Sequence, residues 1–231
     1  MNRTLRVVRM QLINRQTYLW VPLLVLGGAF ILSVAIWWIL AGSGVTGNFY
    51  GGGAQAPLWY LAVVGVQALT LTFPFSQAMS VTRREFFFGT YLIAALSAAS
   101  LAVIFVIGGW IETLTGGWGL NGYFFYSAEI WQGGPLGAAF IFFTVAMLMF
   151  TLGFTGATVY KRFGPTVFTV SLIGLGALLV GAMFIVGRLN AWGEVFGWIG
   201  EQGPLGMAAW GLVAAAALGA AAFATLRRAT P

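Results

Sequence analysis

The sequence contains neither cysteine nor histidine. Without cysteine there are no disulfides, thiolate metal sites or thiol nucleophiles, and without histidine the commonest general base and metal ligand is missing. Charge is also scarce, because only 7% of the residues are Asp, Glu, Lys or Arg. So small a charged fraction is not typical of a soluble domain, whose surface has to be solvated.

Long apolar runs are what the sequence has in abundance. Hydrophobic residues make up 60% of it, and the mean hydropathy is +0.91. Six runs are about 19 to 25 residues long, the length that a helix needs to cross roughly 30 Å of hydrocarbon. We therefore expect an all-α, polytopic membrane protein with six transmembrane helices, near residues 19–41, 57–79, 91–113, 135–159, 166–187 and 204–226.

The basic residues are distributed unevenly between these runs. All but Arg188 lie before the first run or after an even-numbered one: Arg3, Arg6, Arg9, Arg15, Arg83, Arg84, Lys161, Arg162, Arg227 and Arg228. Because basic residues favour the cytoplasmic side, both termini are expected to be cytoplasmic, in the plasma or inner membrane. The net charge of +6 then requires no nucleic acid, since an anionic inner leaflet would attract it.

One membrane domain is expected over 19–228, because no polar segment exceeds about 20 residues and a soluble domain needs roughly 50. Ahead of it, Leu5, Val8 and Leu12 share one helical face while arginines occupy the other. This pattern is typical of an amphipathic helix in the membrane interface and predicts one over 1–18. An ordinary basic flank of the first span is the alternative.

Two of the expected outer loops have unusual compositions. The loop 115–134 mixes glycine with aromatic residues, which suits the headgroup layer of a membrane. In the segment 189–201, Leu189, Trp192 and Phe196 recur at helical spacing, which indicates one or two short surface or re-entrant helices. A simple aromatic anchor is the other interpretation of that segment.

The second run has a mildly polar face formed by Gln67, Thr70, Pro74 and Gln77. No run has an ionisable residue at mid-depth, whereas ion-driven transporters usually need one. A secondary transporter is therefore not favoured. The polar face either lines a transport pathway or only forms hydrogen bonds to neighbouring helices.

Small residues line a face of two further runs. They are Gly211, Ala215 and Gly219 in the sixth run and Gly153 and Ala157 in the fourth. Such faces allow helix backbones to approach closely. We expect contacts within the chain, with a dimer interface as the alternative.

The turn after the second run contains the most informative short motif. Thr82 and Glu85 have the spacing of a capping box, which predicts a short helix beginning there. Two arginines on its first turn are followed by three phenylalanines: Arg83, Arg84, Phe86, Phe87 and Phe88. An apolar knob with a charged rim is typical of a docking surface. A bare loop whose two arginines only set the topology is the alternative.

This layout resembles the type 2 family of ABC transporter permeases, the membrane subunits of bacterial exporters of drugs, peptides, lipids and polysaccharides. The resemblance covers the whole chain and rests on the six spans, the basic N-terminal helix, the Ser-x-x-Arg-Arg-Glu-Phe turn at 80–86 and the helical segment before the last span. It implies a coupling helix that inserts into the ATP-binding subunit, formed by Thr82, Arg83, Arg84, Glu85, Phe86, Phe87 and Phe88. It also implies a connecting helix with Arg6, Arg9 and Arg15, and a route at the dimer interface lined by Gln67, Thr70 and Gln77. The loop 115–134 is longer than the family pattern.

The sequence has no Walker motif, so ATP and Mg would be bound by a partner subunit, and the chain itself is not expected to be an enzyme. The expected function is the permease subunit of an ATP-driven exporter, paired with itself or a sister chain and bound to two ATPase subunits. An apolar lining would suit a drug, peptide or lipid that is amphipathic or hydrophobic. The substrate and the direction of transport stay open.

Two other classes of function fit parts of the pattern. An intramembrane hydrolase would use Ser43, which lies between two glycines but has no histidine to activate it. A scaffold or sensor subunit that transports nothing would use the same docking helix and is the main alternative.

Overall fold

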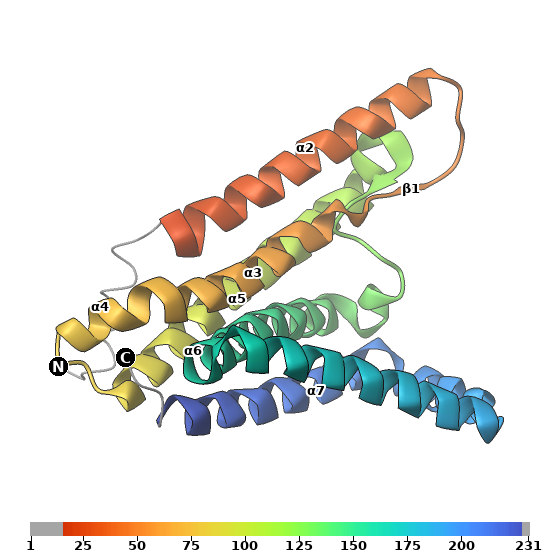
Figure 1. Cartoon of the computed structure of the whole chain (residues 1–231). Coiled ribbons are helices and arrows are strands. Elements are labelled where there is room, and N and C mark those ends of the chain that lie inside the picture. The colour runs from red at the N-terminus through yellow and green to blue at the C-terminus, as the bar shows by residue number, and fades with distance from the viewer. Residues whose placement is uncertain (1–15, 228–231) are drawn as a thin grey trace.

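Long helices form most of the structure, as the apolar runs predict (Figure 1). The computed structural model describes residues 16–227. Within that range, five helical stretches are long and apolar enough to cross a membrane: Val21–Gly42, Gly52–Ala78, Arg83–Thr115, Ile130–Arg188 and Trp192–Leu226. The all-α class is confirmed, and these apolar helices are consistent with a membrane protein.

The first two stretches are built from several consecutive elements. A π-turn, η1 (Gln16–Trp20), leads into α2 (Val21–Gly42). The second stretch runs without interruption through η2 (Gly52–Gln55), α3 (Ala56–Gln67), η3 (Ala68–Thr72) and α4 (Phe73–Ala78). It is followed by α5 (Arg83–Thr115), by η4 (Gly117–Asn121) and by η5 (Ile130–Gly133).

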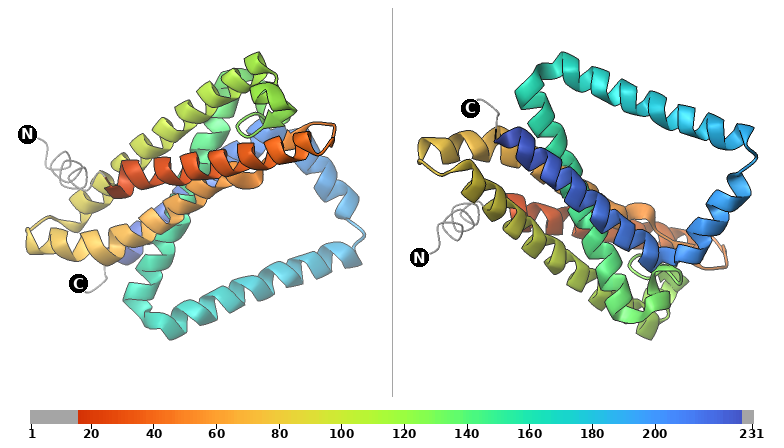
Figure 2. Two further views of the ribbon diagram at one scale, coloured as in Figure 1. Left: turned by 90° about the horizontal axis from the view of Figure 1, so that it is seen from above. Right: turned by 90° about the horizontal axis from the view of Figure 1, so that it is seen from below.

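The longest element, α6 (Gly134–Arg188), lies at the centre of the fold. Its first half packs against α3, α5 and α7 (Trp192–Leu226), and Figure 2 shows it crossing between them. Both of the spans expected at 135–159 and 166–187 fall inside α6, because the helix bends sharply between them instead of ending. The helical segment expected at 189–201 is the first part of α7.

Three glycine–proline pairs set the bends in this half of the chain. Each glycine has a positive φ and a ψ near 180°: Gly134 (70°, −172°) before Pro135, Gly164 (84°, 172°) before Pro165, and Gly203 (59°, −178°) before Pro204. Essentially only glycine adopts this conformation, and proline is favoured at the first position of a helix. Each pair therefore ends one helical direction and begins the next.

Residues 165–202, between the second and third of these bends, form an exposed arm. Every residue from 169 to 180 is exposed, and Leu178 retains 73% of its accessible surface. Figure 2 shows the second half of α6 leaving the bundle and the start of α7 returning to it. This arm is apolar but receives little cover from the rest of the chain.

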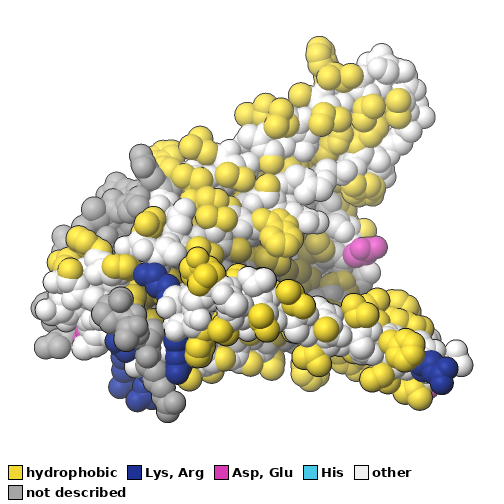
Figure 3. Space-filling view, in the orientation of Figure 1, with side chains coloured by type: hydrophobic (Ala, Val, Ile, Leu, Met, Phe, Trp, Pro, Cys, Tyr) yellow, Lys and Arg dark blue, Asp and Glu magenta, His cyan; other side chains and the backbone are white. Residues whose placement is uncertain are grey.

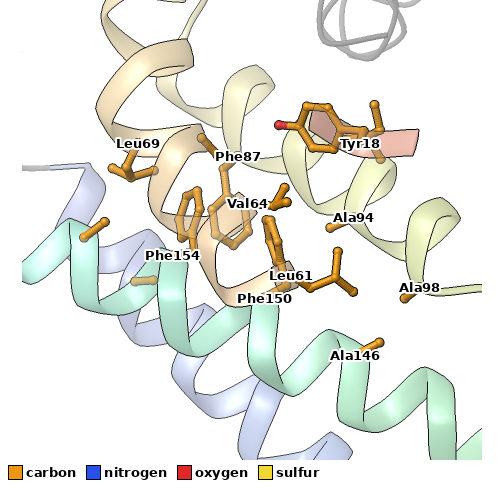
Figure 4. Packing of buried hydrophobic residues seen from close by; sticks show 14 of the residues in the cluster. Tyr18, Leu61, Val64, Leu69, Phe87, Ala94, Ala98, Ala146, Phe150 and Phe154 are labelled. Atoms are coloured by element: carbon orange, nitrogen blue, oxygen red, sulfur yellow. The ribbon is translucent and has the colours of Figure 1, made fainter. Parts of the chain in front are cut away.

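The tightest helix contact joins α3 to α6. A Cβ added at Gly153 would collide with the carbonyl oxygen of Ala62, and one added at Gly65 with that of Phe150. The crossing brings Phe150 and Phe154 of α6 beside Phe87 of α5, as Figure 4 shows. The close approach expected at Gly153 is thus confirmed, and it occurs within the chain.

The small-residue face of α7 also packs within the chain. Ala215 and Gly219 are buried, and a Cβ at Gly219 would lie 3.1 Å from the hydroxyl of Tyr91 on α5. A Cβ at Gly211 would lie 3.3 Å from Thr144 of α6. This confirms the expected contact between helices of one chain.

The loops at one end of the bundle fold onto each other. Two short strands, β1 (Phe49–Tyr50) and β2 (Gly122–Tyr123), pair in parallel and bring the first and third connections together (Figure 1). We call this the aromatic end, formed by residues 43–55 and 116–133. The loop 115–134 was expected to rest on a membrane surface, but Phe124 and Phe125 are buried in the protein instead. They pack with Phe105 and Phe142.

Replacing Gly153 with alanine is expected to lower the stability of the protein by about 1–3 kcal/mol, because the new methyl group has no room against α3. Gly28→Ala on α2 is the matched control, since nothing lies within 4 Å of a Cβ at that helical position. Thermal unfolding in detergent, followed by loss of the monodisperse elution peak, measures the difference. Equal midpoints for both variants would show that the crossing is looser than described.

Candidate functional site

The capping box predicted at the start of α5 is present. The backbone N–H of Glu85 donates to the Thr82 hydroxyl at 3.3 Å, and the N–H of Thr82 donates to the Glu85 carboxylate at 3.0 Å. Both bonds satisfy N–H groups that a helix start leaves without partners. The prediction of a short helix is wrong, because α5 continues from Arg83 to Thr115. The expected docking segment is therefore the first turns of a long helix.

The three phenylalanines after the capping box have different environments. Phe86 is fully buried and Phe87 is 8% exposed, whereas Phe88 is 48% exposed. Phe86 contacts Phe73 of α4 at a ring distance of 5.1 Å, and Phe87 contacts Phe154 at 5.9 Å. The expected knob of three phenylalanines is corrected to a single exposed ring, because the other two stabilise the helix core.

Two arginines hold the last carbonyl groups of α7. Arg83 donates to the carbonyl oxygen of Arg227 at 2.8 Å and to that of Leu226 at 3.4 Å. Arg162 donates to the carbonyl oxygen of Thr225 at 3.4 Å. Helix C-terminal carbonyls lack partners within the helix and carry partial negative charge, so guanidinium groups are favourable there. These bonds tie α5 and α6 to the end of α7.

Two shallow cavities lie at the same end of α7, and arginines line both of them. One, of about 550 Å³, is lined by Arg83, Arg84, Phe88, Phe223 and Arg227. The other, of about 460 Å³, is lined by Arg162, Ala224, Thr225 and Arg227. Figure 3 shows most of the basic side chains on this view gathered at one end of the molecule.

We call this surface the arginine end, formed by Arg83, Arg84, Arg162, Arg227, Phe88 and Phe223. The guanidinium of Arg84 lies 5.9 Å from the ring centre of Phe88, and that of Arg227 lies 5.7 Å from the ring centre of Phe223. At these distances each guanidinium group is attracted to the face of its ring. The surface therefore combines positive charge with exposed aromatic area.

Among the described residues, the predicted pathway residues Gln67, Thr70 and Gln77 do not line this surface. Arg6, Arg9 and Arg15 lie outside the described residues, together with most of the expected interfacial helix 1–18. Thr70 is exposed and donates to the carbonyl oxygen of Val66 at 3.0 Å, and Gln77 donates to that of Val81 at 3.0 Å. Both hydrogen bonds stay within the local segment and reach no neighbouring helix.

The π-turn η3 (Ala68–Thr72) lies within the expected polar face. The spacing of Gln67, Thr70 and Gln77 describes one face only if the helix keeps 3.6 residues per turn. A π-turn at Ala68–Thr72 inserts an extra residue into the turn and rotates the helical residues after it. Gln67 precedes the π-turn and Gln77 follows it, so the two side chains are not in the register of a regular α-helix.

Glu112 is a structurally important residue that sequence reasoning missed. It is fully buried in the last turns of α5, and its carboxylate accepts four hydrogen bonds, all at 2.8 Å. The donors are the indole of Trp118 and the backbone N–H groups of Phe124, Phe125 and Tyr126. Its one sequence signal is an acid within an apolar run, shortly before Gly116 and Gly117. The carboxylate fixes the aromatic end onto α5.

Among residues 16–227, no group of three acidic side chains comes together that would hold a metal ion. The hydroxyl of Ser43 donates to the carbonyl oxygen of Ile39 at 2.9 Å, at the end of α2. Its role there is to satisfy a helix carbonyl.

Comparisons of the chain with protein-family models, curated proteins and solved structures gave no match. The features of the chain that bear on function are the arginine end, the exposed arm and the aromatic end.

Replacing Glu112 with glutamine is expected to loosen the aromatic end, because an amide offers one acceptor oxygen and turns its NH2 group toward backbone donors. Hydrogen exchange at the amides of Phe124, Phe125 and Tyr126 should become about tenfold faster or more, as the loss of roughly 1.4 kcal/mol implies. Glu194→Gln is the control, since Glu194 is exposed on α7. Unchanged exchange would mean that ring packing alone holds the loop.

Proposed function

We propose that the chain is the membrane-embedded permease subunit of an ATP-driven ABC exporter, and that the arginine end is where the ATP-binding subunit docks. The proposal rests on three features that the arginine end combines. A capped helix start, exposed guanidinium groups and an exposed phenylalanine occur together, on a turn that joins two apolar helices.

The docking surface proposed here is smaller than the sequence motif. Arg84 and Phe88 are exposed, whereas Arg83 is engaged with α7, and Phe86 and Phe87 are buried. An ATPase cleft with acidic and aromatic groups would complement the exposed pair, since interfaces rely on a few anchor residues such as arginine and aromatics. Thr82 and Glu85 shape the helix start and do not need to touch the partner.

The same geometry suggests how a movement of the ATPase would reach the membrane helices. A displacement of the turn before α5 would move α5 directly. It would also move the end of α7, because Arg83 is hydrogen-bonded to the carbonyl groups there. Arg162 links α6 to that same helix end. ATP and Mg would be bound by the partner subunit, and this chain would form the path of the cargo across the membrane.

The topology belongs to the same proposal. The bend at Gly164 allows α6 to cross the membrane twice, which gives six crossings from the five long helices. The arginine end would then face the cytoplasm with both termini, in the cell membrane, and the aromatic end would face outward, as basic residues favour the inner side. The cargo would be amphipathic or hydrophobic, and Gln67, Thr70 and Gln77 stay candidates for its route.

A second copy or a sister chain would complete the permease. The exposed arm is an apolar helix pair with open space around Gly174 and Gly181. One side of the arm has only small side chains, those of Ser171, Gly174, Ala177 and Gly181. Helices in membranes associate closely through faces of small residues. We therefore place the contact between two permease chains on this arm.

The coupling proposal predicts that Arg84→Glu combined with Phe88→Ala lowers recovery of a co-purifying ATP-binding subunit by about tenfold or more. ATPase activity of the purified complex should fall in parallel. The measurement is affinity purification of the tagged chain from its native membranes in mild detergent, with mass spectrometry and an ATPase assay.

The matched control is Arg188→Glu, which reverses an exposed charge at the far end of the arm. If the unaltered chain brings down an unrelated membrane complex and no ATPase, the scaffold alternative replaces the transporter. If the double variant retains its ATPase in full, docking occurs elsewhere.

The dimer proposal predicts that Gly174→Leu shifts the chain from dimer to monomer, because the added side chain blocks close approach at the arm. Native mass spectrometry in detergent should show the unaltered chain at twice its mass of 24.7 kDa, and the variant mostly at the single mass. Gly28→Leu is the control, since a Cβ there also meets open space, but on α2. Equal dimer fractions in the two variants would remove the arm as the interface.

A further inference from the structure

A large cavity opens at the aromatic end, and it shares no lining residue with the cavities of the arginine end. Its volume is about 700 Å³, within the roughly 300–1,000 Å³ range of small-molecule sites. The walls come from the start of α3, the loop 122–130 and the first half of α6. Figure 1 shows the start of α3 and the loops of the aromatic end near β1.

The lining of this cavity is unusually rich in aromatic rings. Eight of its twenty lining residues are Phe, Tyr or Trp. Tyr50 and Tyr123 are stacked at 5.7 Å, and Tyr123 also contacts Tyr126 at 5.8 Å. Trp59 contributes a further ring that is 60% exposed. Aromatic faces arranged around a space attract cations through their negative quadrupole.

The charge of the lining has one sign. Glu129 is its only carboxylate, and no Lys or Arg lines the cavity. Within the described residues, the Glu129 side chain forms no hydrogen bond or ion pair. An anionic ligand would meet this carboxylate without a compensating cation, whereas a cationic ligand would pair with it.

The floor of the cavity is apolar and would accommodate a hydrophobic body. Leu58, Ile141, Val145 and Met149 lie on this side. A small inorganic cation would leave their surface unused and would lack the oxygen ligands that such ions prefer. A cation with bulky apolar groups would use the rings, the carboxylate and the floor together.

From this combination we infer that the cavity at the aromatic end binds hydrophobic organic cations. As a cargo site it rests on the proposed transport function and narrows the cargo to this class, whereas binding itself does not require the ATPase. The rings supply the walls, Glu129 supplies the counter-charge, and Glu112 holds the loop that carries four of the rings.

Two probes of the same size and opposite charge test the inference. Tetraphenylphosphonium and tetraphenylborate ions would be dialysed against the purified full chain in neutral-lipid nanodiscs, with empty nanodiscs correcting for partition into lipid. The free concentration is read with ion-selective electrodes. We expect saturable binding of the phosphonium at one site per chain, and no saturable binding of the borate.

Variants then assign the binding to this cavity. Glu129→Gln and Trp59→Leu should each weaken phosphonium binding by about three- to tenfold, as loss of an ionic or cation–π contact implies. Glu194→Gln and Trp198→Leu are the matched controls, since both residues are exposed on α7 outside the cavity. Trp59→Phe keeps a ring and should retain most of the affinity, which separates loss of the ring face from misfolding.

Equal affinity for both probes, or phosphonium binding that survives Glu129→Gln and Trp59→Leu, would overturn the inference and leave an ordinary apolar cavity. Because no ATPase is present in this assay, its failure leaves the docking proposal intact. Conversely, saturable phosphonium binding would stand even if no ATPase partner were recovered.

Discussion

The backbones of α3 and α6 are in direct contact where Gly65 and Gly153 leave out their side chains, and the rest of the structure depends on this crossing. Apolar helices gain no hydrophobic energy from associating in lipid, so close packing has to supply the stability. The crossing fixes the first half of α6, against which both α5 and α7 pack. The relative positions of the helix ends, including those that carry the arginines, depend on it in turn.

The two ends of the bundle use charged side chains in the same way. At one end Arg83 and Arg162 donate to the final carbonyl groups of α7, and at the other Glu112 accepts from three successive backbone N–H groups. These backbone groups have no hydrogen-bond partner within a helix, and the charged side chains supply one. The chain has only five acids and eleven basic residues, and these three of them stabilise backbone ends.

Local patterns in the sequence predicted local structure well. The capping box at Thr82 and the long apolar helices depend on neighbouring residues, and both are present. Burial of Phe86 and Phe87, the rotation introduced by the π-turn and the role of Glu112 were not predictable. The phenylalanines and Glu112 depend on distant partners: Phe87 packs against Phe154, and the carboxylate of Glu112 bonds to groups 12 to 14 residues later in the chain. A pattern of residue types does not say which of these partners will meet.

The three glycine–proline corners have a consequence for assembly. Proline restricts the residue before it, and the positive φ of each glycine is available to almost no other residue. The direction of the arm follows from the backbone conformation at its two bends, and the Tyr160 and Phe168 rings pack across the first of them. The angle between the arm and the bundle is therefore present in the single chain. A partner would meet a preformed surface, and association would lose little free energy to ordering it.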